Sequence, residues 1–147
     1  MTCHWIVVAD RSEAHLYEHK GPGKGLQLLE TLEHPASRRL DHEVYADAPG
    51  VRRSDAGAKR NTTDPTDSYQ RIEAERFARQ IAEHLEKARQ ERRYDKLVLV
   101  AEPRFLGMLR EALPRPTAAL VDGTVAKDLT HADARRLTHA LETVLAV

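Results

Sequence analysis

The chain has 147 residues, 41% hydrophobic and 31% charged, which is typical of one globular domain over residues 1–147. The 23 acidic and 23 basic side chains balance, so any electrostatic recognition of nucleic acid has to come from a local patch. No apolar run reaches the roughly 18 residues of a membrane span, and the single cysteine excludes an internal disulfide, so we expect a cytoplasmic protein with no membrane partner.

The first third of the chain predicts three mainly antiparallel strands. His4–Ala9 is a short apolar run rich in β-branched residues, which suits a strand buried on both faces. Residues 14–19 alternate, and residues 26–33 resume extended character after the Gly/Pro-rich segment 21–25. This segment favours a hairpin turn over a phosphate-binding loop, because Lys24 is followed by another glycine and a strand.

Residues 35–68 are predicted to form a long, mobile loop, because they hold three prolines, two glycines and few large apolar side chains. Long loops often carry function. Two interpretations stay open here, an excursion without a site and a contact for RNA phosphates. The basic residues that could make such contacts are Arg38, Arg39, Arg52, Arg53, Lys59 and Arg60.

The rest of the chain alternates helices with strands. Apolar residues at helical spacing predict a long helix over residues 69–93, capped by Asp67 or Ser68. The remaining predicted elements are a strand at 96–101, a helix beginning at Pro103, a strand at 117–125 with a bulge at Gly123, and a helix capped by Thr130. The order β-β-β-long loop-α-β-α-β-α predicts an α/β fold, a mixed β-sheet with helices packed on it.

Carboxylates near strand ends are the main candidates for catalysis. Asp10 follows the first strand, Glu102 follows the fourth, and Asp122 and Asp128 lie near the last. In ribonuclease H-like nucleases, acids at strand ends hold magnesium for phosphodiester cleavage. Structural roles stay open beside this one, since Asp10 suits the closing of a turn and Glu102 suits a helix N-terminus.

The histidines do not predict a metal site. His15 and His19 are four residues apart, but in a strand that spacing separates them by about 13 Å, too far to share an ion. We therefore expect metal-free, partly exposed histidines and no cofactor. A Ser/His/Asp hydrolase is also disfavoured, because the chain has no Gly-x-Ser-x-Gly.

Several segments together resemble the bacterial host attachment family, whose members are described as required for attachment to host cells. They read WIVVADRSEAHLY at 5–17, EAERFARQIAEHLEKAR at 73–89, YDKLVLVAEPRFLGMLREAL at 94–113 and VAKDLTH at 125–131. That family is similar to the middle domain of archaeo-eukaryotic peptide chain release factors. The resemblance implies a ribonuclease H-like α/β fold with the element order given above.

The same resemblance disfavours one activity, the ester hydrolysis that release factors promote. In release factors the loop before the long helix carries a Gly-Gly-Gln motif that promotes ester hydrolysis on the ribosome. The corresponding loop here reads RRSDAGAKRNTTDPTDSYQ, and Gln70 follows Ser68-Tyr69. Without the two glycines the backbone lacks the freedom for the same close approach. The resemblance therefore implies the fold and not peptidyl-tRNA hydrolysis.

Three hypotheses for function follow. The leading one is a non-catalytic protein whose 35–68 loop and the start of the long helix contact RNA or the ribosome. Its phosphate contacts would be Arg52, Arg53, Lys59, Arg60 and Arg71. The second is a metal-dependent nuclease or hydrolase that uses Asp10, Glu102 and Asp122. The third is a module that binds a protein partner in attachment, or forms a homodimer through an exposed sheet edge.

Overall fold

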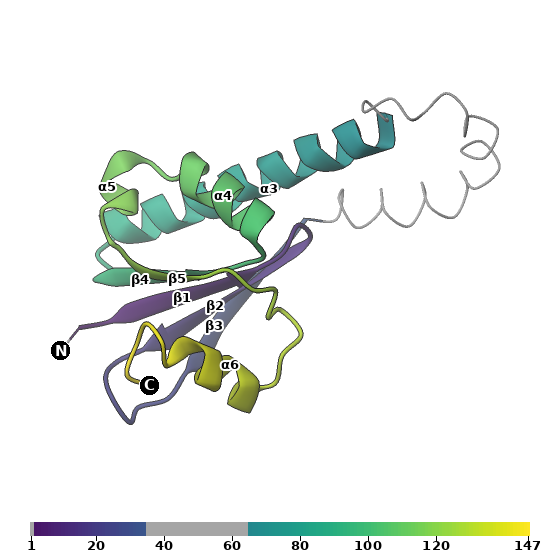
Figure 1. Ribbon diagram of the computed structural model, residues 1–147. Helices are drawn as coiled ribbons and strands as arrows, with labels where there is room; N and C mark the ends of the chain where they lie inside the picture. The colour runs from purple at the N-terminus through teal and green to yellow at the C-terminus, as the bar shows by residue number, and fades with distance from the viewer. Residues whose placement is uncertain (1, 35–64) are drawn as a thin grey trace.

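A computed structural model describes residues 2–34 and 65–147 (Figure 1). It contains one mixed sheet of five strands in the order β3-β2-β1-β4-β5. β1 pairs antiparallel with β2 and parallel with β4, and these pairings join the hairpin half of the sheet to the parallel half. The strands are β1 (His4–Ala9), β2 (Glu13–His19), β3 (Gln27–Glu33), β4 (Lys96–Val100) and β5 (Val121–Val125).

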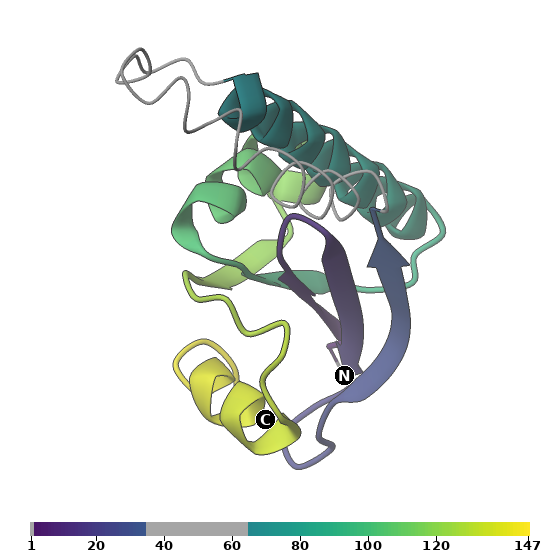
Figure 2. The same ribbon diagram turned by 90° about the vertical axis from the view of Figure 1, so that its right-hand side faces the viewer.

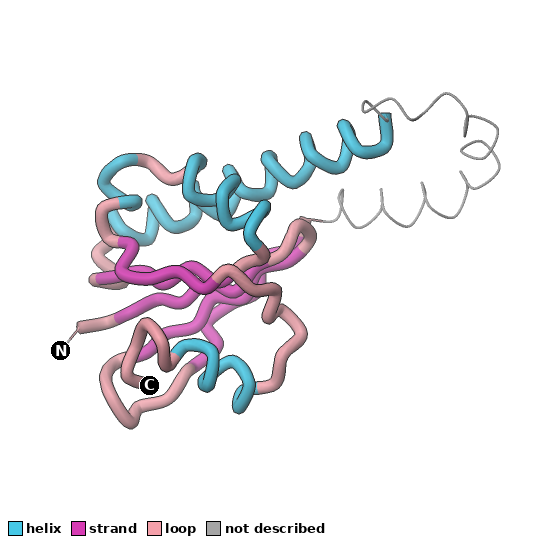
Figure 3. Tube along the Cα trace, in the orientation of Figure 1, coloured by secondary structure: helices cyan, strands magenta, loops and turns pink. Residues whose placement is uncertain are grey.

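Helices cover both faces of the sheet. α3 (Pro65–Gln90), α4 (Pro103–Ala112) and α5 (Arg115–Ala118) lie on one side, and α6 (Ala134–Leu141) lies on the other (Figures 1 and 2). The coloured tube of Figure 3 shows the same three layers, with the strands in magenta between the helices. The predicted mixed sheet with packed helices is therefore confirmed.

The two faces of the sheet bury separate sets of apolar side chains, because consecutive strand residues point to opposite sides. In β1, Trp5 and Val7 join the core under α3 and α4, whereas Ile6 and Val8 join the core under α6. β4 alternates in the same way. This is why both strands read as continuous apolar runs, as expected for strands covered on both faces.

The long helix α3 supplies the largest part of the first core. Its buried stripe recurs at helical spacing, and burying each large side chain contributes about 1.5–3 kcal/mol. The stripe consists of Ala74, Phe77, Ala78, Ile81, Ala82, Leu85 and Ala88. Just after the helix, the Tyr94 hydroxyl donates a hydrogen bond to the Leu85 carbonyl at 2.7 Å, which ties the following segment back to α3.

The boundaries of α3 differ from the prediction. The helix begins at Pro65, a residue suited to a first turn because its missing N–H needs no partner there. Asp67 and Ser68 therefore lie inside the helix and are not its cap. The helix ends at Gln90, and Arg92 adopts a φ of 59° that stops it before residue 93. The predicted 35–68 loop otherwise lies outside the described residues.

Two predictions in the last third were wrong. Residues 115–118 form the short helix α5, with Pro116 in its first turn, and β5 starts only at Val121. The bulge lies beside the predicted glycine, because Leu97 pairs with Val121 and the next residue of β4 pairs with Gly123. The last helix is capped by Asp133, whose carboxylate accepts the Arg136 N–H at 2.8 Å, and not by Thr130.

Within residues 2–34 and 65–147, no helix combines the length and the apolar character that crossing a membrane requires.

Candidate functional site

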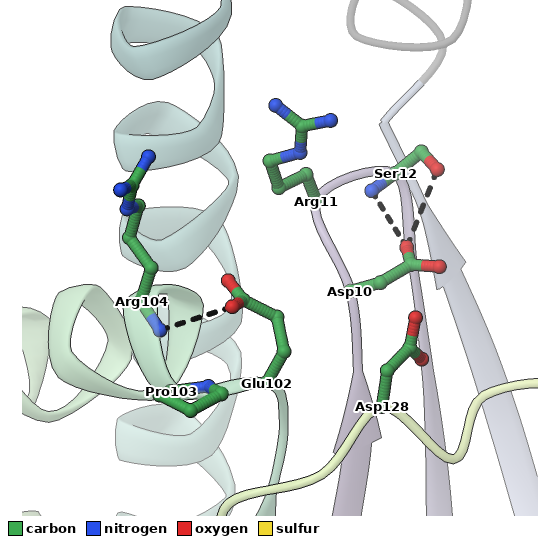
Figure 4. Close-up of a pocket in the computed structure, with 7 residues that line it drawn as sticks. All are labelled: Asp10, Arg11, Ser12, Glu102, Pro103, Arg104 and Asp128. Carbon is green, nitrogen blue, oxygen red and sulfur yellow. Dashed lines mark hydrogen bonds between the residues drawn. The ribbon is translucent and has the colours of Figure 1, made fainter.

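A pocket of about 690 Å³ opens at the end of the sheet where the parallel strands β1 and β4 finish. Open α/β sheets commonly bind ligands at this edge. The pocket is lined by Asp10, Arg11, Ser12, Glu102, Pro103, Arg104 and Asp128 (Figure 4). Thus two of the three carboxylates proposed from sequence, Asp10 and Glu102, meet in one cavity.

Asp10 closes the turn between β1 and β2. Its Oδ1 accepts the backbone N–H groups of Ser12 and Glu13, each at 2.8 Å, and the Ser12 hydroxyl lies 3.3 Å away. This is the hydrogen bonding of an Asx turn, which the Asp10-Arg11-Ser12 sequence favours. The predicted structural role of Asp10 is therefore confirmed, and its carboxylate is held in a fixed place in the pocket.

Glu102 is the N-cap of α4. Its Oε1 accepts the N–H of Phe105 at 2.7 Å, and its Oε2 accepts the N–H of Arg104 at 3.1 Å. Because the first N–H groups of a helix have no intrahelical partner, these bonds stabilise the start of α4. The expected role at a helix N-terminus is confirmed, and it directs the Glu102 carboxylate into the pocket (Figure 4).

Asp128 reaches the pocket from the connection between β5 and α6. The Thr130 hydroxyl lies 2.8 Å from Oδ1 of Asp128 and 3.1 Å from Oδ2 of Asp10, so one hydroxyl links the two carboxylates. Thr130 thus holds the connection against the β1–β2 turn. Figure 4 shows Asp128 beside Asp10, with Glu102 across the pocket from both.

Two arginines line the same pocket as these carboxylates. Arg11 and Arg104 are both exposed, and their side chains extend on the two sides of the pocket (Figure 4). A site with carboxylates and guanidinium groups suits a phosphate with its metal ion, because the acids hold the cation and the arginines hold the anion. It suits a purely apolar ligand poorly.

Asp122 does not belong to this pocket. It lies at the start of β5, and its carboxylate contacts Nε2 of His4 at 3.0 Å. His4 begins β1, whereas Asp10 follows the end of that strand, so Asp122 lies at the opposite end of the sheet from Asp10 and Glu102. The proposed triad Asp10–Glu102–Asp122 is therefore wrong as a group, and Asp128 takes the third place.

Most of the proposed RNA contacts lie outside the described residues, namely Arg38, Arg39, Arg52, Arg53, Lys59 and Arg60. Arg71 is described, and it is exposed on α3 close to Tyr69 and Ile72, which are 61% and 42% exposed. The first turns of α3 extend past the edge of the sheet, whereas its later turns pack on it (Figure 1). Arg71 therefore lies in the exposed start of α3, just before the buried residues Glu73 and Ala74.

The histidines are placed partly as expected. His15 and His19 both lie on strand β2, so they do not form a shared site. His19, however, is buried, and its two ring nitrogens each lie 2.8 Å from a carbonyl oxygen, those of Gly25 and Ala146. It joins the hairpin turn to the C-terminal segment, and the expectation of a partly exposed side chain was wrong for it.

One group of potential metal ligands converges in the described part of the chain, and no sequence pattern predicted it. Ligand atoms of Asp10, Glu13 and His131 all lie within 4.8 Å of one another. No spacing rule connects His131 with Asp10, because the two residues come from opposite ends of the chain. Only the fold brings them together.

The sequence is similar to that of known proteins. The sequence profile of the family described as "Protein required for attachment to host cells" matches residues 5–141. An uncharacterised protein of Rickettsia prowazekii is 30% identical over 133 residues, covering 84% of this chain and 82% of the relative.

Among solved structures, the archaeal translation termination factor aRF1 has a similar fold. Its TM-score is 0.52 at 13% identity, and the match covers 96% of this chain but only 39% of that factor. A structure titled "Archaeal protein" matches with a TM-score of 0.46 at 14% identity, over 96% of this chain and 38% of its own. The match to aRF1 alone shows that this α/β fold is similar to that of part of a release factor.

Proposed function

This chain belongs to the family of proteins required for attachment to host cells, and we propose that it is a non-catalytic protein that binds RNA or the ribosome. The contact surface consists of the start of α3 together with the basic residues of 35–68. Such a role requires a cytoplasmic location, which cell fractionation tests. Attachment would then depend on the protein indirectly, through translation or its regulation.

The start of α3 is the observation that carries this proposal. Tyr69 exposes an aromatic ring on which a base can stack, and Arg71 exposes a guanidinium for phosphate. Tyr69 is 61% exposed, so most of its ring is accessible to a ligand. The neighbouring segment adds Arg52, Arg53, Lys59 and Arg60 in sequence.

The fold similarity is compatible with this role. The solved structure with the similar fold is titled as a translation termination factor, and this chain spans 39% of it. Since the likeness is at 13% identity, it supports the architecture alone. The chain lacks Gly-Gly-Gln, so the proposal leaves ester hydrolysis out, and it rests on the start of α3 and the basic residues of 35–68.

Sedimentation of cell lysate through sucrose gradients at low and high salt tests the proposal. We expect the protein to co-sediment with ribosomal subunits at low salt and to return to the top as salt rises, because phosphate contacts release counterions. Arg71→Glu combined with charge reversal at Arg52, Arg53, Lys59 and Arg60 should abolish the association without changing the melting temperature. Arg135→Glu, which reverses one charge on the exposed surface of α6, is the matched control for Arg71→Glu alone, which should weaken the association.

Two results would contradict this function. Protein that stays at the top of the gradient at low salt has no ribosome contact, and full binding by the charge-reversed variant places any contact elsewhere. Either result would favour the alternative of a module for a protein partner or a homodimer. Pull-down and the measured mass in solution then identify that alternative.

The pocket supports a second candidate, a metal-dependent phosphoester hydrolase of ribonuclease H-like type. Its basis is the meeting of Asp10, Glu102 and Asp128 in one cavity flanked by Arg11 and Arg104. Carboxylates of this kind would hold Mg²⁺ or Mn²⁺, which would activate water and stabilise the charge on a transferring phosphate. Asp10 and Glu102 hold a turn and a helix start. Asp128 accepts hydrogen bonds from the N–H and hydroxyl of Thr130, and Asp128→Asn keeps an oxygen that can accept both, so Asp128 is the carboxylate best suited to substitution.

Turnover of single-stranded and double-stranded RNA or DNA with Mg²⁺ or Mn²⁺ tests this candidate. Asp128→Asn should remove the activity, and Asp122→Asn should preserve it, because Asp122 lies at the other end of the sheet. No turnover on any of these nucleic acids rejects hydrolysis of them. Equal loss in both variants would show that the effect does not come from the pocket.

A further inference from the structure

Three potential metal ligands from three separate segments meet beside the pocket. Asp10 follows β1, Glu13 begins β2, and His131 lies in the connection between β5 and α6. Their ligand atoms all lie within 4.8 Å of one another. We propose that these side chains bind a transition-metal ion such as Zn²⁺. The proposal depends on neither of the two functions above.

The spacing of the donor atoms suits such an ion. Ligands about 2.0–2.2 Å from a tetrahedral zinc ion lie roughly 3.4 Å from each other. Nε2 of His131 lies 3.5 Å from Oε1 of Glu13, so the two atoms can accept one ion between them with little movement. The ligand atoms of the whole group lie within 4.8 Å of one another, so binding requires the Glu13 and His131 side chains to move toward the Asp10 carboxylate.

The donor types select the class of metal. One imidazole nitrogen with two carboxylate oxygens favours Zn²⁺ or a related transition metal over Ca²⁺ and Mg²⁺, which prefer oxygen ligands alone. Three protein ligands also leave a fourth position for water or an anion, as in zinc sites that act on a ligand. Asp10 is shared with the pocket, where Arg11 and Arg104 suit an anionic group.

The fold holds the Asp10 carboxylate in place before any ion binds and positions the segment that carries His131. Oδ1 of Asp10 is fixed by the N–H groups of Ser12 and Glu13. Oδ2 of Asp10 contacts the hydroxyl of Thr130, the residue directly before His131. Because these contacts position the turn and the connection, little additional ordering is needed when the ion binds.

His15 provides an independent second contact at Glu13. Its Nε2 lies 3.7 Å from Oε1 of Glu13, and its Nδ1 lies 3.2 Å from the Thr31 hydroxyl on the neighbouring strand β3. Two imidazoles therefore approach the same carboxylate oxygen, one from β2 and one from the β5–α6 connection. Metal-binding carboxylates are commonly oriented by such outer partners, and we assign this positioning role to His15.

Calorimetric titration of ZnCl₂ into the full chain, after treatment with a chelator, tests the site. We expect one ion per chain, and we expect His131→Ala to weaken binding by at least about tenfold. The matched control is His139→Ala, since His139 is also exposed, on α6, and contacts Glu142. The side chains of His131 and His139 are 80% and 85% exposed, so neither substitution should disturb folding.

Thermal unfolding gives a second readout. Zinc should raise the melting temperature of the unchanged chain and of His139→Ala, and should raise that of His131→Ala much less. A chain that takes up no zinc overturns the proposal, as does a His131→Ala variant that binds it as tightly. Zinc binding without turnover on any nucleic acid would support the site and reject the hydrolase, so the two ideas fail separately.

Discussion

Asp10 and Glu102 show that a side chain can be required by the fold and still line a candidate site. Their oxygens accept backbone N–H groups at a turn and at a helix start, and the same bonds aim both carboxylates at one pocket. Substituting either residue therefore changes structure as well as chemistry. Asp128 and His131 are better residues to test, because both are exposed and neither caps a helix.

Cys3 should be an unreactive thiol. Burial, with the nearby Glu18 carboxylate at 3.5 Å, raises the pKa of the Cys3 thiol from 9.0 to about 11. The thiolate is the reactive form, so at pH 8 alkylation in the folded protein should be roughly 100-fold slower than in the denatured chain. Glu18→Gln should lower the pKa and speed the reaction in part, since burial remains. Equal rates in the folded and denatured protein would contradict this.

Glu86 should make the free energy of unfolding depend on pH in the acid range. Hydrogen bonds from Arg89 and then Thr117 lower the pKa of Glu86 from 4.5 to about 2. A lowered pKa stabilises the fold above the unfolded value near 4.5, and this contribution is lost as pH falls toward 2. Urea unfolding should therefore find Glu86→Gln less stable at pH 7, with the difference shrinking below pH 4.5. Arg89→Gln should lose stability with the same pH dependence. A loss of stability that does not vary with pH would contradict the role of the lowered Glu86 pKa.

At the scale of elements, the sequence predicted strands and helices correctly where one apolar pattern ran through the whole segment. The apolar runs at 4–9 and 96–101 and the helical stripe of α3 predicted those elements, because burial on both faces leaves little choice of residue. The strand expected at 117–125 was wrong in its first part, since residues 115–118 form the short helix α5 with Pro116 in its first turn. That error misplaced Asp122, because a strand starting at Val121 puts this residue at its beginning.

The site could be predicted only in part for a related reason. Asp10 and Glu102 could be predicted as site residues, since each directly follows an apolar run that forms a strand. Asp128 and His131 lie in a connection without periodicity, and their positions depend on the Thr130 contact to Asp10, a residue far away in sequence. Such contacts follow from the completed fold and from no local pattern.

Gly123 should be required in β5, unlike the glycine of α4. A Cβ at Gly123 would lie 2.8 Å from Cβ of Val144, so Gly123→Ala forces the C-terminal segment away and should destabilise the fold by about 1–3 kcal/mol. Gly107→Ala is the matched control, because nothing lies within 4 Å of its added Cβ. Alanine should stabilise α4 there by up to about 1 kcal/mol. Urea unfolding that gives both variants the same change would contradict the packing argument.

At the scale of the whole molecule, β1 and β4 couple the two cores. Each strand places alternate side chains under α3 and α4 and under α6, so neither core can lose its strands while the other keeps them. Trp5, the single tryptophan, reports on one face only: it lies under α3 and α4, with the Tyr94 ring 5.0 Å away and the Arg93 guanidinium 5.0 Å from its own ring.

Leu141→Ala tests this coupling from the opposite face. Leu141, the last residue of α6, is fully buried in the core between α6 and the sheet, so its truncation should cost about 2–5 kcal/mol. If the sheet unites both cores, urea unfolding followed by Trp5 fluorescence and by circular dichroism should shift together to lower urea. Leu28→Ala, the same change at a side chain 52% exposed, should move neither midpoint appreciably. A shift in circular dichroism that leaves Trp5 fluorescence unchanged would mean that α6 and its core unfold separately, because only an uncoupled face can lose its packing without reaching Trp5.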